Sequence, residues 1–149
     1  MREAVVILDD KELELFARHV SLKEIGAPGQ ARLLDTRVFV ADDVPAREAL
    51  VVGLARSGVE IVGDEVTATW RVEASELSPP GVVDFGSGQV DVGPFDFALA
   101  NRLEASGAVA TKERWLGALL ACEIVLAILG HRPPTFSLVC DFPDYRRQS

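Results

Sequence analysis

RVFVADDVPAREALVVGLARSGVEIVG is the sequence of residues 37–63. An apolar run at 37–41 is followed by a turn, by a segment with helical periodicity at about 45–57, and by a second apolar run at about 59–63. This order predicts a strand, a helix and a second strand, which is how nucleotide-binding α/β units are built. The turn after the first strand contains no glycine, although such turns use glycine to bring backbone N–H groups close to phosphate. The stretch therefore predicts the unit without its usual ligand site.

The composition of the whole chain predicts one compact domain over residues 1–149. The chain is 48% hydrophobic and its mean hydropathy is +0.19, so it has enough apolar side chains for a sizeable core. Its formal net charge of −8 and its pI of about 4.7 disfavour binding to nucleic acids or anionic membranes, because both attract surfaces rich in Lys and Arg. We therefore expect neither kind of partner.

Two helices are predicted before the first strand. The first is expected to begin at Asp9 or Asp10, where acidic residues suit the positive end of a helix dipole, and to continue to Val20. Its apolar residues share one face: Leu13, Phe16, Ala17 and Val20. Residues 26–34 end that helix and begin a second, short one.

The second half of the chain has a less regular pattern. Residues 64–94 contain alternating apolar and polar side chains interrupted by Pro and Gly, which predicts a small meander or an extended crossing segment. Four further elements are expected: a short helix at 96–106, a brief strand at 108–110, a long helix at 113–129, and a last strand at 135–142. The tail that follows has no predicted element.

The long helix at 113–129 is apolar nearly all the way round, unlike a helix on a protein surface. We therefore expect it to lie between the sheet and another layer. That layer could come from the same chain or from a second subunit, and the sequence does not choose between them.

Neither the cysteines nor the N-terminus indicates a metal site or an export signal. Cys122 and Cys140 lie in apolar runs without zinc-site or redox-pair spacing, so we expect ordinary buried thiols and neither metal nor cofactor. The N-terminal apolar run is too short for a signal peptide, and residues 116–129 fall short of the roughly 20 residues that span a bilayer. A cytoplasmic location is expected.

The N-terminal part of the chain carries a specific series of residues. They are Arg18, His19 and Val20, then Glu24, Ile25 and Gly26, then Gly29, Gln30, Leu33 and Leu34. In this spacing they resemble the N-terminus of the ThiF/MoeB/HesA family, the adenylating enzymes related to ubiquitin-activating enzyme. Leu15 stands where that family has its first arginine.

A weaker resemblance continues near the C-terminus. Glu123 and Gly130 match the family's Gly-x-x-x-Ala-x-Glu-Ala-x-Lys-x-x-x-Gly helix, while Leu126 replaces its lysine. Asp141 falls where the family often ends a strand with Tyr-Asp. Together the two ends cover roughly half of the chain. The resemblance implies an α/β, Rossmann-like three-layer sandwich with a mostly parallel sheet, shortened, and with N-terminal helices.

This chain lacks the glycine-rich phosphate turn of the family. An ungapped comparison puts Asp42, Val44 and Arg47 at its three glycine positions, with Pro45 beside them. Side chains fill the space that phosphate would need, and Pro45 removes an N–H donor. Asp42 and Asp43 add negative charge, and we expect a carboxylate to cap the helix in place of a bound anion. The turn thus predicts a retained fold that excludes its nucleotide.

Other family motifs are also missing. The acidic residue that would bind ribose falls on Val62, Gly63 or Asp64, depending on register. The Asp-Asn-x-x-Arg-Gln segment that contacts ATP has no counterpart in residues 64–81, and there is no catalytic-cysteine loop. The missing motifs are those that bind the nucleotide and carry out catalysis in the family.

Arg18 is the strongest candidate for a functional residue. In catalytic relatives the matching arginine reaches across the dimer to the partner's ATP, so the resemblance implies an arginine finger that acts in trans. The alternative is a solvated helix arginine paired with Glu14, one turn earlier.

The remaining candidates have plainer interpretations. His19 is expected to be structural, and Glu123 to be either a functional acid with a raised pKa or a hydrogen-bonded structural acid. His131 and Arg132 place positive charge after the long helix, where it suits the helix dipole. Trp70 and Trp115 are expected to anchor the core or an interface.

These observations favour a non-catalytic ThiF/MoeB/HesA-like protein that acts as a homodimer or as the partner subunit of a catalytic relative. Two alternatives stay open. One is an active ATP-dependent adenylyltransferase of a ubiquitin-like or sulfur-carrier protein, with a rebuilt site. The other is a binding module for such a carrier protein.

Overall fold

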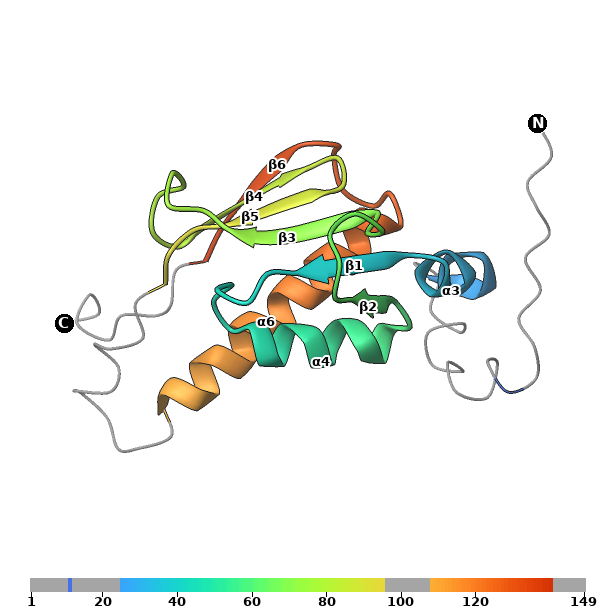
Figure 1. Ribbon diagram of the computed structural model, residues 1–149, viewed down its shortest axis with the longest axis horizontal. Coiled ribbons are helices and arrows are strands. Elements are labelled where there is room, and N and C mark those ends of the chain that lie inside the picture. The colour runs from blue at the N-terminus through green and yellow to red at the C-terminus, as the bar shows by residue number, and fades with distance from the viewer. Residues whose placement is uncertain (1–10, 12–24, 96–107, 141–149) are drawn as a thin grey trace.

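The computed structural model describes residue 11, residues 25–95 and residues 108–140 (Figure 1). Three helices and six strands follow one another in these residues. In chain order they are α3 (Gly26–Leu34), β1 (Arg37–Val40), α4 (Arg47–Ser57), β2 (Glu60–Val62), β3 (Trp70–Ala74), β4 (Val82–Gly86), β5 (Gln89–Val92), α6 (Ala108–Ile128) and β6 (Phe136–Val139). The predicted strand–helix–strand unit at 37–63 is confirmed as β1, α4 and β2, with β1 and β2 parallel.

All six strands belong to one sheet, in the order β2-β1-β3-β5-β4-β6. β1 pairs in parallel with both β2 and β3, and β3 pairs in parallel with β5. β4 is antiparallel to both of its neighbours, β5 and β6. The expectation of a mostly parallel sheet is therefore wrong, and the sheet is mixed. The tight Ser87–Gly88 turn joins β4 directly to β5, and a connection this short permits only antiparallel pairing.

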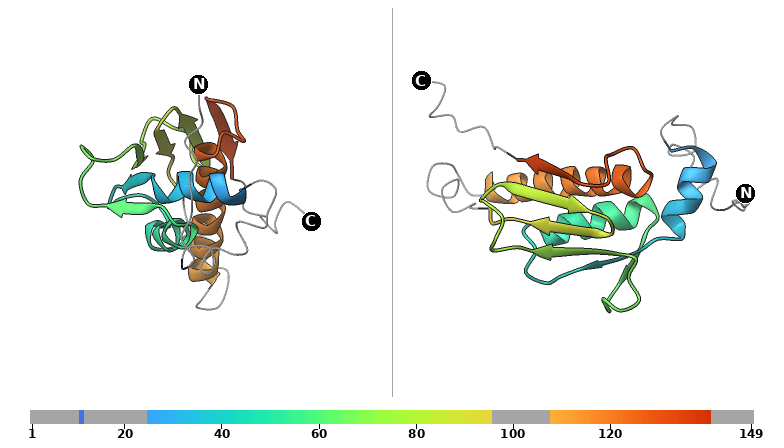
Figure 2. Two further views of the ribbon diagram at one scale, coloured as in Figure 1. Left: turned by 90° about the vertical axis from the view of Figure 1, so that its right-hand side faces the viewer. Right: turned by 90° about the horizontal axis from the view of Figure 1, so that it is seen from above.

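The two faces of the sheet differ in polarity. Alternate residues such as Val38, Val72 and Val90 are fully buried against the helices, while their neighbours Arg71 and Asp91 lie on the other face. α4 and α6 lie on the same side of the sheet, as both views in Figure 2 show. No helix of residues 25–95 and 108–140 covers the polar face, so the expected three layers are not found in this part of the chain. Alternation of this kind is typical of a sheet with one wet face.

α4 and α6 pack against each other unusually closely, through small residues. A Cβ atom added to Gly53 would lie 2.7 Å from the Cβ of Ala121, and one added to Gly117 would lie 2.7 Å from the backbone N of Leu50 and would also meet Ala49. The helices run parallel, because Ala49 lies beside Gly117 and Gly53 lies beside Ala121. This contact places the N-termini of both helices at the same end of the molecule.

Several expected elements are found and others differ. α3 and β6 lie where the sequence predicted them. Residues 64–94, expected to form a small meander or an extended crossing segment, supply β3, β4 and β5 of the main sheet. They are not a meander, because β3 pairs in parallel with β5 and does not pair with β4. The expected strand at 108–110 is wrong, because these residues form the first turn of α6. Of the predicted helix at 9–20 only residue 11 is described, and it is helical. The predicted helix at 96–106 and the tail after 142 lie outside the described residues. Across residues 25–95 and 108–140, we find no helix with the length and apolar character needed to cross a bilayer.

Candidate functional site

The turn between β1 and α4 is the counterpart of a phosphate-binding turn, and its own side chains occupy it. Val44 is buried in the hydrophobic core, with 4% of its surface exposed. The Nε of Arg47 donates a hydrogen bond of 3.3 Å to the carbonyl oxygen of Val40, the last residue of β1. The same Nε lies 3.7 Å from a carboxylate oxygen of Asp42, whose side chain is fully exposed. The Arg47 side chain thus folds back over the end of the strand.

The expected capping of α4 by a carboxylate is wrong. The N-cap residue is Ala46, and no side chain caps the helix. The carboxylate of Asp42 pairs with Arg47 instead, because the turn closes through a hydrogen bond from Val44 N to Ala41 O (3.3 Å) and thereby points Asp42 into solvent. Within the part of the chain that the structure describes, Ala46 is the only non-glycine residue with a positive φ, at 58°. α4 therefore begins after a left-handed alanine, and no acidic side chain caps its N-terminus.

Ala46→Gly should stabilise the fold, because glycine adopts this backbone conformation without steric strain. A left-handed residue with a Cβ costs roughly 1–2 kcal/mol, and the greater unfolded-state entropy of glycine offsets about half of that gain, so the free energy of unfolding should rise by about 0.5–1 kcal/mol. Urea denaturation measures it. Ala55→Gly, on the exposed side of α4 in ordinary helical conformation, is the matched control and should destabilise by about 1 kcal/mol.

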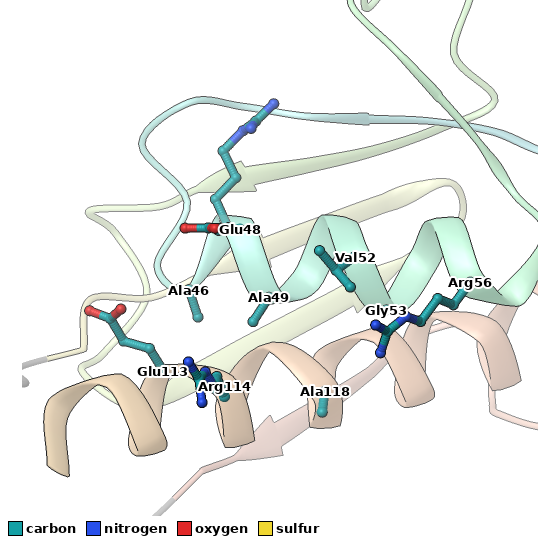
Figure 3. A pocket seen from close by; sticks show the side chains of 10 residues that line it. Ala46, Glu48, Ala49, Val52, Gly53, Arg56, Glu113, Arg114 and Ala118 are labelled. Atoms are coloured by element: carbon teal, nitrogen blue, oxygen red, sulfur yellow. The ribbon is translucent and has the colours of Figure 1, made fainter. Parts of the chain in front are cut away.

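A groove of about 620 Å³ begins at this turn and follows α4 along its contact with α6 (Figure 3). Ala46, Ala49, Val52 and Gly53 line it from α4, and Ala118 lines it from α6. Val52 is 43% exposed, so the floor of the groove is apolar and open to solvent. The small residues at the helix contact create this shape, since they bring the two backbones together and leave few side chains above them.

Charged residues of both signs border the groove. Glu48 and Glu113 lie near its N-terminal end, while Arg56 extends from α4 toward α6 and Arg114 projects from α6 (Figure 3). Within residues 25–95 and 108–140, neither Arg56 nor Arg114 makes an ion pair or a hydrogen bond. The groove lining therefore carries Arg56 and Arg114 together with Glu48 and Glu113, so it offers charges of both signs to a ligand or partner segment.

A second pocket, of about 370 Å³, lies at the other end of α6. Three aromatic residues contribute to it, Trp70, Phe85 and Phe136, together with Arg132 and the Pro133–Pro134 pair. The rings of Phe85 and Phe136 stack at a centroid distance of 4.3 Å and also belong to the core or pack against it. This pocket lies where β4 and β6 meet, and its lining is mainly structural.

Glu123 is a hydrogen-bonded structural acid. Both of its carboxylate oxygens accept hydrogen bonds from Arg132, at 2.8 and 3.1 Å, and its side chain is only 13% exposed. The hydrogen bond and the charge of Glu123 raise the pKa of Arg132. Burial, followed by the charge of Glu123, raises the pKa of the Cys140 thiol. The pair fixes the connection from α6 to β6, as a bidentate arginine–carboxylate contact does.

The other sequence candidates are distributed over the fold. Arg18 and His19 lie outside the described residues. Asp64 follows β2, but its carboxylate accepts a hydrogen bond of 2.8 Å from Val66 N and so closes a local turn. The expectation for Cys122 is wrong: it is exposed on α6, because the face of an all-apolar helix that packs inward cannot be read from its periodicity. Cys140 is buried as expected.

Trp70 packs against the core, as one of its two interpretations expects, whereas Trp115 is 48% exposed on α6. Pro45 is half-buried beside Val44 in the turn. Sequence reasoning missed Arg56, Arg114 and the whole α4–α6 groove. The small residues Gly53 and Gly117 were the available signal, since glycines inside helices often mark close helix contacts.

No three His, Cys, Asp or Glu side chains of residues 25–95 and 108–140 gather where they could hold a metal ion. Comparison of the sequence with models of known protein families found no matching family, and comparisons with curated proteins and with solved structures likewise found no match.

Proposed function

We propose that this protein is a non-catalytic, Rossmann-like relative of the ThiF/MoeB/HesA enzymes that acts by binding another protein subunit. The observation that carries the proposal is the filled turn after β1. Arg47 folds back onto Val40, Val44 enters the core, and Asp42 places a negative charge beside the strand end. A phosphate would have to displace the arginine and would lie against a carboxylate, and both oppose nucleotide binding.

The arrangement of the strands supports the proposed relationship to the ThiF/MoeB/HesA enzymes. The parallel strands β2, β1 and β3 form the part of the sheet around the turn, with α4 as the crossover helix between β1 and β2. Rossmann-type sheets place their ligand at the carboxyl ends of such strands, where this chain has Asp42 and Arg47. We infer that the chain has the strand arrangement of the family and lacks its nucleotide chemistry.

Association is the activity that such a scaffold retains. The strand β6 forms one edge of the sheet, and Val139 on it is 71% exposed. Unpaired edge strands readily pair with another chain. We infer either a homodimer or a heterodimer with a catalytic relative, located in the cytoplasm, with a ubiquitin-like carrier protein as a further possible partner.

Light scattering across micromolar concentrations should report an assembly of two or more copies of the purified protein. The physical reason is the exposed apolar surface on a chain of only 149 residues, which association would cover. A monomer throughout this range would contradict the homodimer and leave a partner subunit as the remaining form of the proposal. A complex purified with a catalytic relative from the native host would then be required.

A further inference from the structure

The outer face of α4 carries three residues that follow one another along one side of the helix. Glu48, Val52 and Arg56 are four residues apart, so successive members lie roughly 6 Å apart along the helix axis. All three are exposed, and the exposed fraction of Val52 is 43%. Glu48 lies at one end of the groove, Arg56 lies toward the other end, and Val52 lies between them (Figure 3). The row therefore has a negative end, an apolar centre and a positive end.

A row with this order of charges is complementary to a reversed copy of itself. A two-fold axis that passes through Val52, perpendicular to α4, places a second α4 antiparallel to the first. Glu48 and Arg56 are each four residues from Val52, so the axis brings Glu48 of each copy level with Arg56 of the other. Val52 then lies opposite Val52. This charge complementarity favours a second copy of the chain as the occupant of the face.

The charged residues of the groove agree with this pairing. Within residues 25–95 and 108–140, neither Glu48 nor Arg56 makes an ion pair or a hydrogen bond, so both can pair with a second copy. Glu113 of α6 lies at the same end as Glu48, where it adds negative charge for an incoming Arg56. Arg114 lies beside Glu113 and offsets part of that charge. The direct pair between copies is therefore Glu48 with Arg56.

The shape of the groove also suits a second valine at its centre. Ala49 and Gly53 line it from α4, and Ala118 lines it from α6. None of these residues has a side chain longer than a methyl group, so they leave space beside Val52. An apolar side chain from a second copy can occupy that space and remove Val52 from water.

We propose that two copies of this chain form a two-fold dimer through the outer face of α4 and the adjoining groove. α4 of one copy lies antiparallel to α4 of the other, Val52 packs against Val52, and Glu48 pairs with Arg56 in both directions. The inference rests on the proposed function, in which the protein acts by association, and it names the surface and the partner. It assigns the homodimer to the helices and does not use the β6 edge.

Charge reversal tests the pairing in the full-length chain. Glu48→Arg and Arg56→Glu each replace two opposite-charge contacts across the axis with two like-charge contacts. Each variant alone should therefore dimerise with a Kd about 30-fold higher than that of the unmodified chain. A 1:1 mixture of the two variants restores both opposite-charge contacts in a mixed dimer, and the double variant restores them within one chain. Both should recover the unmodified affinity.

Sedimentation equilibrium measures these Kd values, and circular dichroism verifies that each variant is folded. Glu65→Arg is the matched control, because Glu65 is exposed on the loop between β2 and β3 and its replacement changes the net charge by the same amount as Glu48→Arg. This control should leave the Kd unchanged.

A cysteine at the axis tests the geometry independently. In a Cys122→Ser background, Val52→Cys should form a disulfide with its own copy in the second chain when oxidised glutathione is added. Val66→Cys in the same background is the matched control, since Val66 is 87% exposed and lies between β2 and β3. The disulfide between chains should form about ten times faster in Val52→Cys, because the axis raises the local thiol concentration. Buried Cys140 should remain a thiol in both variants.

Three results would overturn the proposal. They are an unmodified chain that stays monomeric, a dimer whose Kd neither charge reversal changes, and equal rates of disulfide formation in the two cysteine variants. The second result would assign association to another surface, such as the β6 edge. All three leave a heterodimer with a catalytic relative standing as the proposed function. ATP binding by the folded protein would instead contradict the proposed function and leave this dimer unaffected.

Discussion

Arg18→Ala should slow adenylation by a catalytic partner subunit by about two orders of magnitude, which is the usual effect of losing a charge contact in the transition state. The resemblance assigns Arg18 the position of an arginine that reaches a partner's ATP, and under the proposed function the turn at Asp42–Arg47, which Arg47 occupies, binds no nucleotide of its own. The measurement is single-turnover adenylate formation by the reconstituted complex. Folding and assembly should be unchanged, because an arginine at a solvated position of the helix that the sequence predicts for residues 9–20 would contribute little to stability.

Two variants make the Arg18 result specific. Lys11→Ala removes a positive charge from the same segment and should leave the rate unchanged. Arg18→Lys keeps the charge but loses the planar fork of donors, so it should recover only part of the activity. If the Arg18→Ala complex adenylates at the unmodified rate, or if the native host yields no catalytic partner, Arg18 is a solvated helix residue and a homodimeric scaffold is the better account.

Gly117→Val should destabilise the fold by about 3 kcal/mol or more, enough to unfold much of a marginally stable domain. Even the Cβ atom would lie 2.7 Å from the backbone N of Leu50 and 2.8 Å from the carbonyl carbon of Ala49. Because these neighbours are backbone atoms, α4 can relieve the clash only by moving away from α6. Thermal unfolding followed by circular dichroism measures the loss.

Two controls separate this clash from the general cost of replacing glycine. Gly63→Ala adds a Cβ with no atom within 4 Å and should leave stability nearly unchanged. Gly53→Ala meets only the Cβ of Ala121, so the exchange Gly53→Ala with Ala121→Gly should recover most of the stability that Gly53→Ala loses. A Gly117→Val protein that melts like the unmodified one would contradict the close helix contact and, with it, the origin of the groove.

The local pattern of the sequence was sufficient for the strand–helix–strand unit and the last strand. Val38 and Val40 alternate with outward-facing residues, and Gly58 ends α4 with a left-handed φ of 106°, so each signal acts within a few residues. The pairing of β3 between β1 and β5 was not predictable in this way. It joins residues far apart in the chain, and alternation alone does not specify which strands become neighbours.

The candidate site was predicted in part, for a similar reason. Residue types predicted a turn at Asp42–Arg47 without the features of a glycine-rich phosphate turn. They did not predict that Asp42 would pair with Arg47 instead of capping α4. Ala46, between β1 and α4, has a left-handed backbone conformation that no propensity of alanine predicts. Arg56 and Arg114 are 58 residues apart in the sequence, so only the contact between α4 and α6 brings them to one groove.

Isothermal titration of the protein with ATP and Mg²⁺ tests most directly the central claim that this Rossmann-like protein does not bind ATP. The titration should reach about 5 mM ATP, so that even a Kd near 1 mM would give measurable saturation. The filled turn predicts only the heat of dilution, with the folded state verified in the same sample. A saturable single-site isotherm would contradict the account and favour an adenylyltransferase with a rebuilt site.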